Sequence, residues 1–119
     1  MENGYIWTIN GCEFEVDMED AETADKYLVA LKVFENARNT ETNSISEKIR
    51  TYCKICREFY DVFLGEGSSE KIFSGISDNS RKYDAVFESL LDFISRQRIE
   101  SDGRMSKIAQ RYAPKRRLK

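Results

Sequence analysis

The stretch Phe59–Gly75, FYDVFLGEGSSEKIFSG, decides how this chain is expected to fold. An apolar helical run ends at Gly65, where a residue with left-handed backbone geometry commonly terminates a helix. Gly67 adds a second flexible point, and Ser68 can start a new short turn. Because the stretch is rich in large apolar side chains and carries no catalytic motif, it predicts a hinge between helices that serves packing and recognition.

Helical patterns flank this hinge on both sides. Upstream, Ser44 and Glu47 form a capping box ahead of a helix that stops at Gly65. Its apolar residues recur at spacings of three and four: Ile45, Ile49, Tyr52, Cys53, Cys56, Phe59, Tyr60 and Phe63. Downstream, Asn79 or Ser80 caps a further helix, which we expect to end near Ser101–Gly103. Its apolar stripe consists of Tyr83, Val86, Phe87, Leu90, Leu91 and Ile94.

A short basic amphipathic helix is expected after Gly103. Its apolar residues at helical spacing are Met105, Ile108, Ala109 and Tyr112. Arg104, Lys107 and Arg111 lie elsewhere around the same helix, and Pro114 ends the pattern. The last five residues, 115–119, are too charged to pack and are expected to form a tail.

A β-hairpin is expected at the N-terminus. Tyr5–Ile9 and Cys12–Val16 flank Asn10-Gly11, and this dipeptide between alternating segments is the strongest short-range hairpin signal. A lone hairpin is only marginally stable in water. We therefore expect it to lie on the helices or to pair with a strand of a partner.

The first helix is expected to run from its cap, Asp17, to about Ala37, with a polar loop at Arg38–Asn43. Its core stripe consists of Ala24, Tyr27, Leu28, Leu31 and Phe34. The predicted fold class is thus α+β, mainly α: an N-terminal hairpin, three main helices and a short basic C-terminal helix. We divide the chain into one mainly helical domain, residues 1–103, and a basic C-terminal helix and tail, residues 104–119.

The charges of this 119-residue chain are strongly polarised, although its net charge is only −2. Residues 1–25 hold eight acids and no base, whereas residues 103–119 hold seven bases and no acid. Residues 1–102 carry 21 acids against 12 bases, a net charge of −9, and the remainder carries +7. This polarity favours head-to-tail self-association or a tail that binds an acidic partner. A solvated tail that merely aids solubility is an equally open interpretation.

The sequence carries no signature of an enzyme or of a cofactor or metal site. It has no histidine, so the usual general base and one of the two common zinc ligands are missing. Cys53 and Cys56 are spaced as Cys-x-x-Cys, but they fall in mid-helix without a second cysteine pair, so we interpret them as core residues. With Cys12, the three cysteines are an odd number, which favours a reducing cytoplasm. No apolar run is long enough for a membrane span or a signal sequence.

The segment Phe59–Gly75, the acidic-aromatic helix Tyr83–Ile94 and the closing Arg111–Arg116 together carry a family resemblance. In these features the chain resembles small proteins from the tail-gene clusters of phages and prophages of Gram-positive bacteria, and it looks like a tail assembly chaperone. The resemblance implies a non-enzymatic cytoplasmic protein that holds the long helical tape-measure protein until the tail tube polymerises around it. It also implies exposed apolar grooves and self-association.

Our first hypothesis is therefore a chaperone that binds an amphipathic helical client and forms homo-oligomers. The client is expected in a groove formed by Phe59, Tyr60, Phe63, Ile72 and Phe73. The basic residues Arg104, Lys107 and Arg111 are expected to meet acidic surface on a neighbour. One alternative is a structural tail or head-completion component of the virion. Another is a small nucleic-acid-binding regulator that uses the basic tail, which the acidic body argues against.

Overall fold

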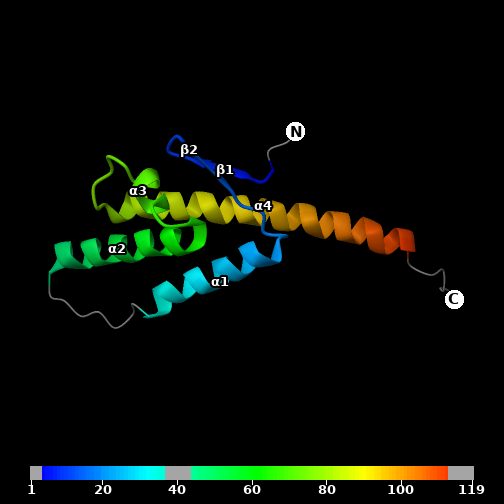
Figure 1. The fold of residues 1–119 in the computed structure, drawn as a ribbon, viewed down its shortest axis with the longest axis horizontal. Helices are drawn as coiled ribbons and strands as arrows, with labels where there is room; N and C mark the ends of the chain where they lie inside the picture. The colour runs from blue at the N-terminus through cyan, green and yellow to red at the C-terminus, as the bar shows by residue number, and fades with distance from the viewer. Residues whose placement is uncertain (1–3, 37–43, 113–119) are drawn as a thin grey trace.

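The computed structural model describes residues 4–36 and 44–112, which form a two-stranded hairpin followed by helices (Figure 1). The elements are β1 (Ile6–Ile9), β2 (Cys12–Glu15), α1 (Ala21–Asn36), α2 (Ile45–Leu64), α3 (Ser68–Ile72) and α4 (Ser80–Tyr112). The fold is therefore α+β and mainly α, as predicted. The expected loop at residues 38–43 and the tail at residues 115–119 lie outside the described residues.

The N-terminal hairpin is confirmed, and it lies on the helices of its own chain. Asn10 and Gly11 have φ values of 50° and 80°, the positive values that a tight hairpin turn with the right twist requires. Trp7, which pairs with Phe14 across the hairpin, stacks on Tyr60 of α2 with 6.1 Å between ring centroids. Its indole Nε1 donates a hydrogen bond of 3.1 Å to Ser89 Oγ of α4. These contacts supply the burial that the hairpin needs to be stable.

The helix caps follow local side-chain chemistry, with one correction. Glu47 N donates to Ser44 Oγ at 3.3 Å, so the predicted capping of α2 is confirmed. The predicted cap of α1 was wrong, because Asp20 rather than Asp17 accepts from Thr23 N, at 3.2 Å. Asp17 instead closes the preceding turn by accepting from Glu19 N at 3.0 Å.

The last helix differs most from the sequence expectation. Asn79 caps it as predicted, since Lys82 N donates to Asn79 Oδ1 at 3.0 Å. The expected end near Ser101–Gly103 was wrong, because α4 continues unbroken through Gly103 to Tyr112. One interior glycine costs only about 1 kcal/mol, whereas a separate helix would have to be nucleated again. The basic segment is thus the second half of a 33-residue helix.

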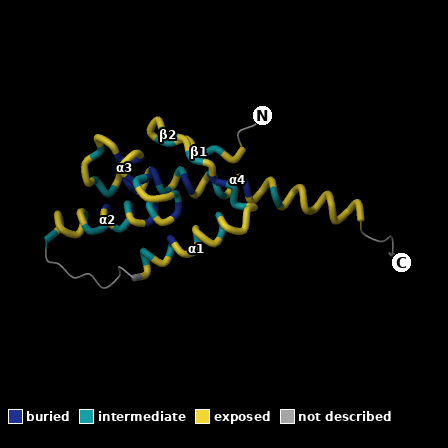
Figure 2. Tube along the Cα trace, in the orientation of Figure 1, coloured by how far each residue is buried: buried dark blue, intermediate teal, exposed yellow. Residues whose placement is uncertain are grey.

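The core lies where α1, α2, α3 and the first half of α4 meet beneath the hairpin (Figure 2). Phe59 is its centre, with its ring 5.3 Å from that of Phe34 on α1 and 5.5 Å from that of Phe87 on α4. At the other end Phe73 and Tyr83 stack face to face at 3.8 Å. Aromatic side chains from three helices therefore join the elements into one body.

Candidate functional site

The residues predicted to form a client groove lie instead in the core. Phe59, Tyr60, Phe63, Ile72 and Phe73 are between 0% and 5% exposed. The hairpin covers them from one side through Trp7, and α1 covers them from the other through Tyr27 and Phe34. The prediction of an exposed groove at these residues was wrong, because the apolar pattern revealed a packing face without revealing what covers it.

The two cysteines of α2 are buried as well, which agrees with their interpretation as core residues. Burial raises the pKa of the Cys56 thiol to about 11, and burial also raises the pKa of Cys53. Both side chains are therefore neutral thiols at physiological pH, which is the unreactive form. Within residues 4–36 and 44–112, no three potential metal-ligating side chains cluster closely enough to hold an ion.

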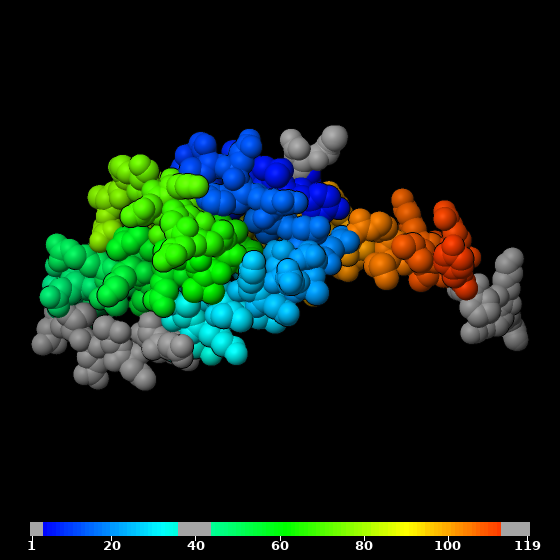
Figure 3. Space-filling model, in the orientation of Figure 1, coloured from blue at the N-terminus to red at the C-terminus, as the bar shows by residue number. Residues whose placement is uncertain are grey.

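The second half of α4 is the most exposed part of the described chain. We call residues 98–112 the arm; of these, only Ser101 is not exposed. The arm extends beyond the body formed by the other elements (Figure 3). Its large apolar side chains are open to solvent, with Met105 59%, Ile108 43% and Tyr112 76% exposed. Exposed apolar side chains grouped in this way are typical of a binding surface.

The exposed apolar residues continue the stripe that packs in the core. Ile108 lies 18 residues after the buried Leu90, and Tyr112 lies 18 residues after the half-buried Ile94. Eighteen residues make about five turns, so each pair faces the same direction. We call Met105, Ile108 and Tyr112 the arm seam. It is the core-facing side of α4, continued beyond the point where the body ends.

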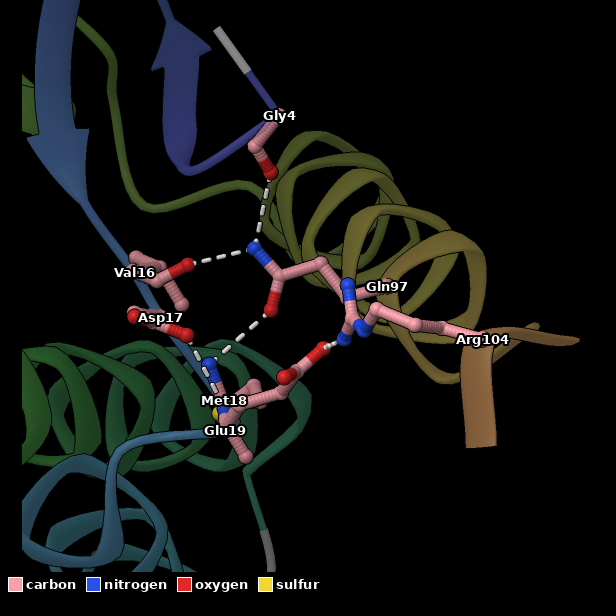
Figure 4. Close-up of polar contacts among 7 residues, drawn as sticks. All are labelled: Gly4, Val16, Asp17, Met18, Glu19, Gln97 and Arg104. Carbon is pink, nitrogen blue, oxygen red and sulfur yellow. Dashed lines mark hydrogen bonds and ion pairs between the residues drawn. The ribbon is translucent and has the colours of Figure 1, made fainter. Parts of the chain in front are cut away.

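The arm is fixed to the body at its root by Gln97, which is buried (Figure 4). Its Nε2 donates to the carbonyl oxygens of Gly4 at 2.9 Å and Val16 at 2.6 Å. Its Oε1 accepts from Met18 N at 2.9 Å. The amide thus satisfies backbone groups on both sides of the hairpin, at Gly4 before β1 and at Val16 and Met18 between β2 and α1. Gln97 was not predicted as a site residue, and its only signal in the sequence is a polar side chain at a position where the stripe would place an apolar one.

The structure places all three predicted basic residues on the exposed arm. Arg104 forms an ion pair with Glu19 of the segment before α1 (Figure 4). Lys107 and Arg111 are exposed and form no ion pair within the described residues. The arm therefore combines an apolar seam with basic side chains that remain available for an acidic partner.

A hollow of about 630 Å³ lies between β1 and the part of α4 next to the arm. Its walls include Trp7 and Phe93 together with the acids Glu88, Asp92 and Glu100. Histidine is missing from the whole chain, and cysteine is missing from these walls, so the hollow offers neither imidazole nor thiol.

The described helices also include no segment apolar and long enough to span a bilayer.

Comparison with protein families gave one finding. The family model described as a family of unknown function (DUF6673) matches residues 10–119, which cover the second hairpin strand and all four helices. Comparisons with curated proteins and with solved structures gave no match.

Proposed function

The chain belongs to the DUF6673 family, and we propose that it is a non-enzymatic assembly protein that binds a helical partner along its arm. The observation that carries this proposal is the uncovered arm seam. The stripe that buries Leu90 in the core continues for about four further turns in solvent, from Gln97 to Tyr112. A folded chain rarely leaves such a stripe without a partner.

The spacing of the seam favours a helix as the partner. Ile94, Ser101, Met105, Ile108 and Tyr112 fall on one heptad pattern with a and d positions separated by three and four residues. A second helix that packs on this pattern would bury Met105, Ile108 and Tyr112, and each large apolar side chain contributes about 1.5 to 3 kcal/mol. Lys107 and Arg111 beside the seam favour acidic residues on the flanks of that helix.

The resemblance to phage tail assembly chaperones supports a specific client. In that family the client is the tape-measure protein, a long helical chain of the kind that the arm seam suits. We propose that this protein holds such a client in the cytoplasm before the tail tube forms. The binding surface is then the arm, and the packed residues around Phe59 support the body that carries it.

Two matched substitutions on the arm test the proposal. Ile108 belongs to the seam, whereas Ile99 is 69% exposed on the opposite side of the same helix. Ile108→Ser is expected to weaken co-purification with the tape-measure protein of the same gene cluster by about tenfold or more, the effect of losing a buried isoleucine. Ile99→Ser is expected to leave it unchanged. Equal capture by both variants, or no capture by the unaltered chain, would overturn the proposal.

A further inference from the structure

The chain carries a second uncovered surface, on the N-terminal half of α1. Residues 13–25 hold seven acids and no base. Glu22 and Asp25 are exposed on α1, followed at helical spacing by Leu28 and Val29, which are 59% and 55% exposed. The predicted place of Leu28 in the core stripe was therefore wrong. We call these four residues the α1 face. The first bases after this stretch are Lys26, to one side of the helix, and Lys32, one turn beyond Leu28.

The α1 face and the arm are complementary in chemistry and in length. The arm presents apolar side chains flanked by Lys107 and Arg111, and the α1 face presents an apolar pair preceded by acids. The arm has 15 residues and α1 has 16, so each is about 23 Å long. The ion pair between Arg104 and Glu19 already joins the base of the arm to the acidic stretch within one chain.

The arm of a molecule cannot reach its own α1 face. Gln97 fixes the root of the arm beside the start of α1, and from there the arm and α1 run in opposite directions (Figure 1). Because α4 is one continuous helix through Gly103, the arm cannot fold back without breaking it. Only another molecule can place an α1 face against the arm seam.

We propose that the arm of one copy packs on the α1 face of a second copy, which covers the arm seam until a helical client displaces it. The inference rests on the proposed function in one respect, namely that the arm is the binding surface. It goes further by naming a second copy as the occupant in the absence of client. Lys107 and Arg111 then lie against Glu22 and Asp25 of the other molecule, and the seam lies against Leu28 and Val29.

Charge exchange between two variants tests this pairing directly. The arm variant is Lys107→Glu with Arg111→Glu, and the face variant is Glu22→Lys with Asp25→Lys; none of these four side chains has an ion pair within the described residues. Sedimentation velocity in 20 mM salt is expected to show self-association of the unaltered chain and at least about tenfold weaker association of each variant alone. An equimolar mixture of the two variants is expected to associate again. The acidic arm of the arm variant then meets the basic face of the face variant, and the basic arm of the face variant meets the acidic face of the arm variant.

A matched control separates the pairing from net charge. Lys48→Glu with Lys54→Glu, on the exposed side of α2, changes the net charge by as much as the arm variant and is expected to leave self-association intact. A monomeric unaltered chain at low salt, or a mixture that stays as weakly associated as its parts, would overturn the inference. Client capture by the face variant distinguishes the two proposals. If this variant still captures the client, the proposed function stands even when self-association is not observed.

Discussion

The two halves of α4 have the same apolar pattern, but the stripe is buried in the first half and exposed in the second. In the first half Tyr83, Val86 and Leu90 are buried against the other elements, and in the second half Met105, Ile108 and Tyr112 face solvent in the same direction. The difference lies in what covers the stripe, since the arm extends beyond the body formed by the other elements (Figure 3). A helical apolar stripe therefore identifies a surface that can be buried, and only the tertiary structure shows whether the chain itself buries it.

The comparison predicts that truncating a side chain in the packed body lowers stability much more than truncating a side chain on the arm. Phe59→Ala removes a fully buried ring that contacts aromatic side chains on α1 and α4, so the free energy of unfolding is expected to fall by about 3 to 5 kcal/mol. Ile108→Ala on the arm is expected to change it by less than about 0.5 kcal/mol, because Ile108 is exposed and is not part of the hydrophobic core. Urea denaturation followed by circular dichroism measures both, and similar losses would show that the arm packs on something.

The junction between the two regions is expected to be the next most sensitive point. Gln97→Met keeps the approximate length of the side chain but removes the partners of Val16 O and Met18 N, so stability is expected to fall by about 2 to 4 kcal/mol. Arg96→Met one position earlier, where the side chain is exposed, is the control and is expected to be nearly neutral. If the two variants unfold at the same urea concentration, Gln97 does not hold the arm root.

Most of the fold could be predicted from the sequence, because it is encoded by local chemistry. The Asn10-Gly11 turn, the caps Ser44 and Asn79 and the stop at Gly65 each depend on a few neighbouring residues, and the structure confirms them. Local signals fail where two neighbours compete for one role. Asp17 and Asp20 are both good caps, and only the path of the chain from the hairpin determines that Asp20 caps α1.

The candidate site was much harder to predict from the sequence, because exposure is a tertiary property. The residues around Phe59 and those around Ile108 have similar spacings, and the sequence alone assigned recognition to the more aromatic set, which proved to be the core. Gln97 was missed for a related reason. A glutamine in a helix is usually a surface residue, and its burial follows from backbone groups supplied by residues more than 75 positions away.

A pH titration tests the other half of the comparison, the burial of side chains in the body. The folded-state pKa of Cys56 is about 11 because of burial, above the ordinary value of 9.0. The unfolded chain therefore loses this proton at lower pH than the folded chain, so stability is complete below pH 9 and falls as the pH rises from 9 to 11. The expected loss from this thiol is about 1 to 3 kcal/mol. Urea denaturation of the unaltered chain and of Cys56→Ala at pH 8 and pH 11 measures this loss. The difference in unfolding free energy between the two proteins is expected to narrow at pH 11, and a difference that does not narrow would contradict the burial of this thiol.

The smallest predicted effect concerns the arm itself. Gly103 lies inside α4 with open space around its Cα, and its φ is not in the positive range that favours glycine, so Gly103→Ala introduces no strain. The substitution is expected to stabilise the local helix by about 0.5 to 1 kcal/mol, because alanine has less backbone freedom to lose. Amide hydrogen exchange measured by mass spectrometry is therefore expected to slow by about two- to fivefold in peptides from the arm, in proportion to this local gain. Exchange in peptides from α2 is expected to stay the same, because we expect the packed body to open independently of the exposed arm. Equal slowing in both regions would mean that the arm and the body unfold as one unit, and the contrast between the two halves of α4 would then be one of exposure alone.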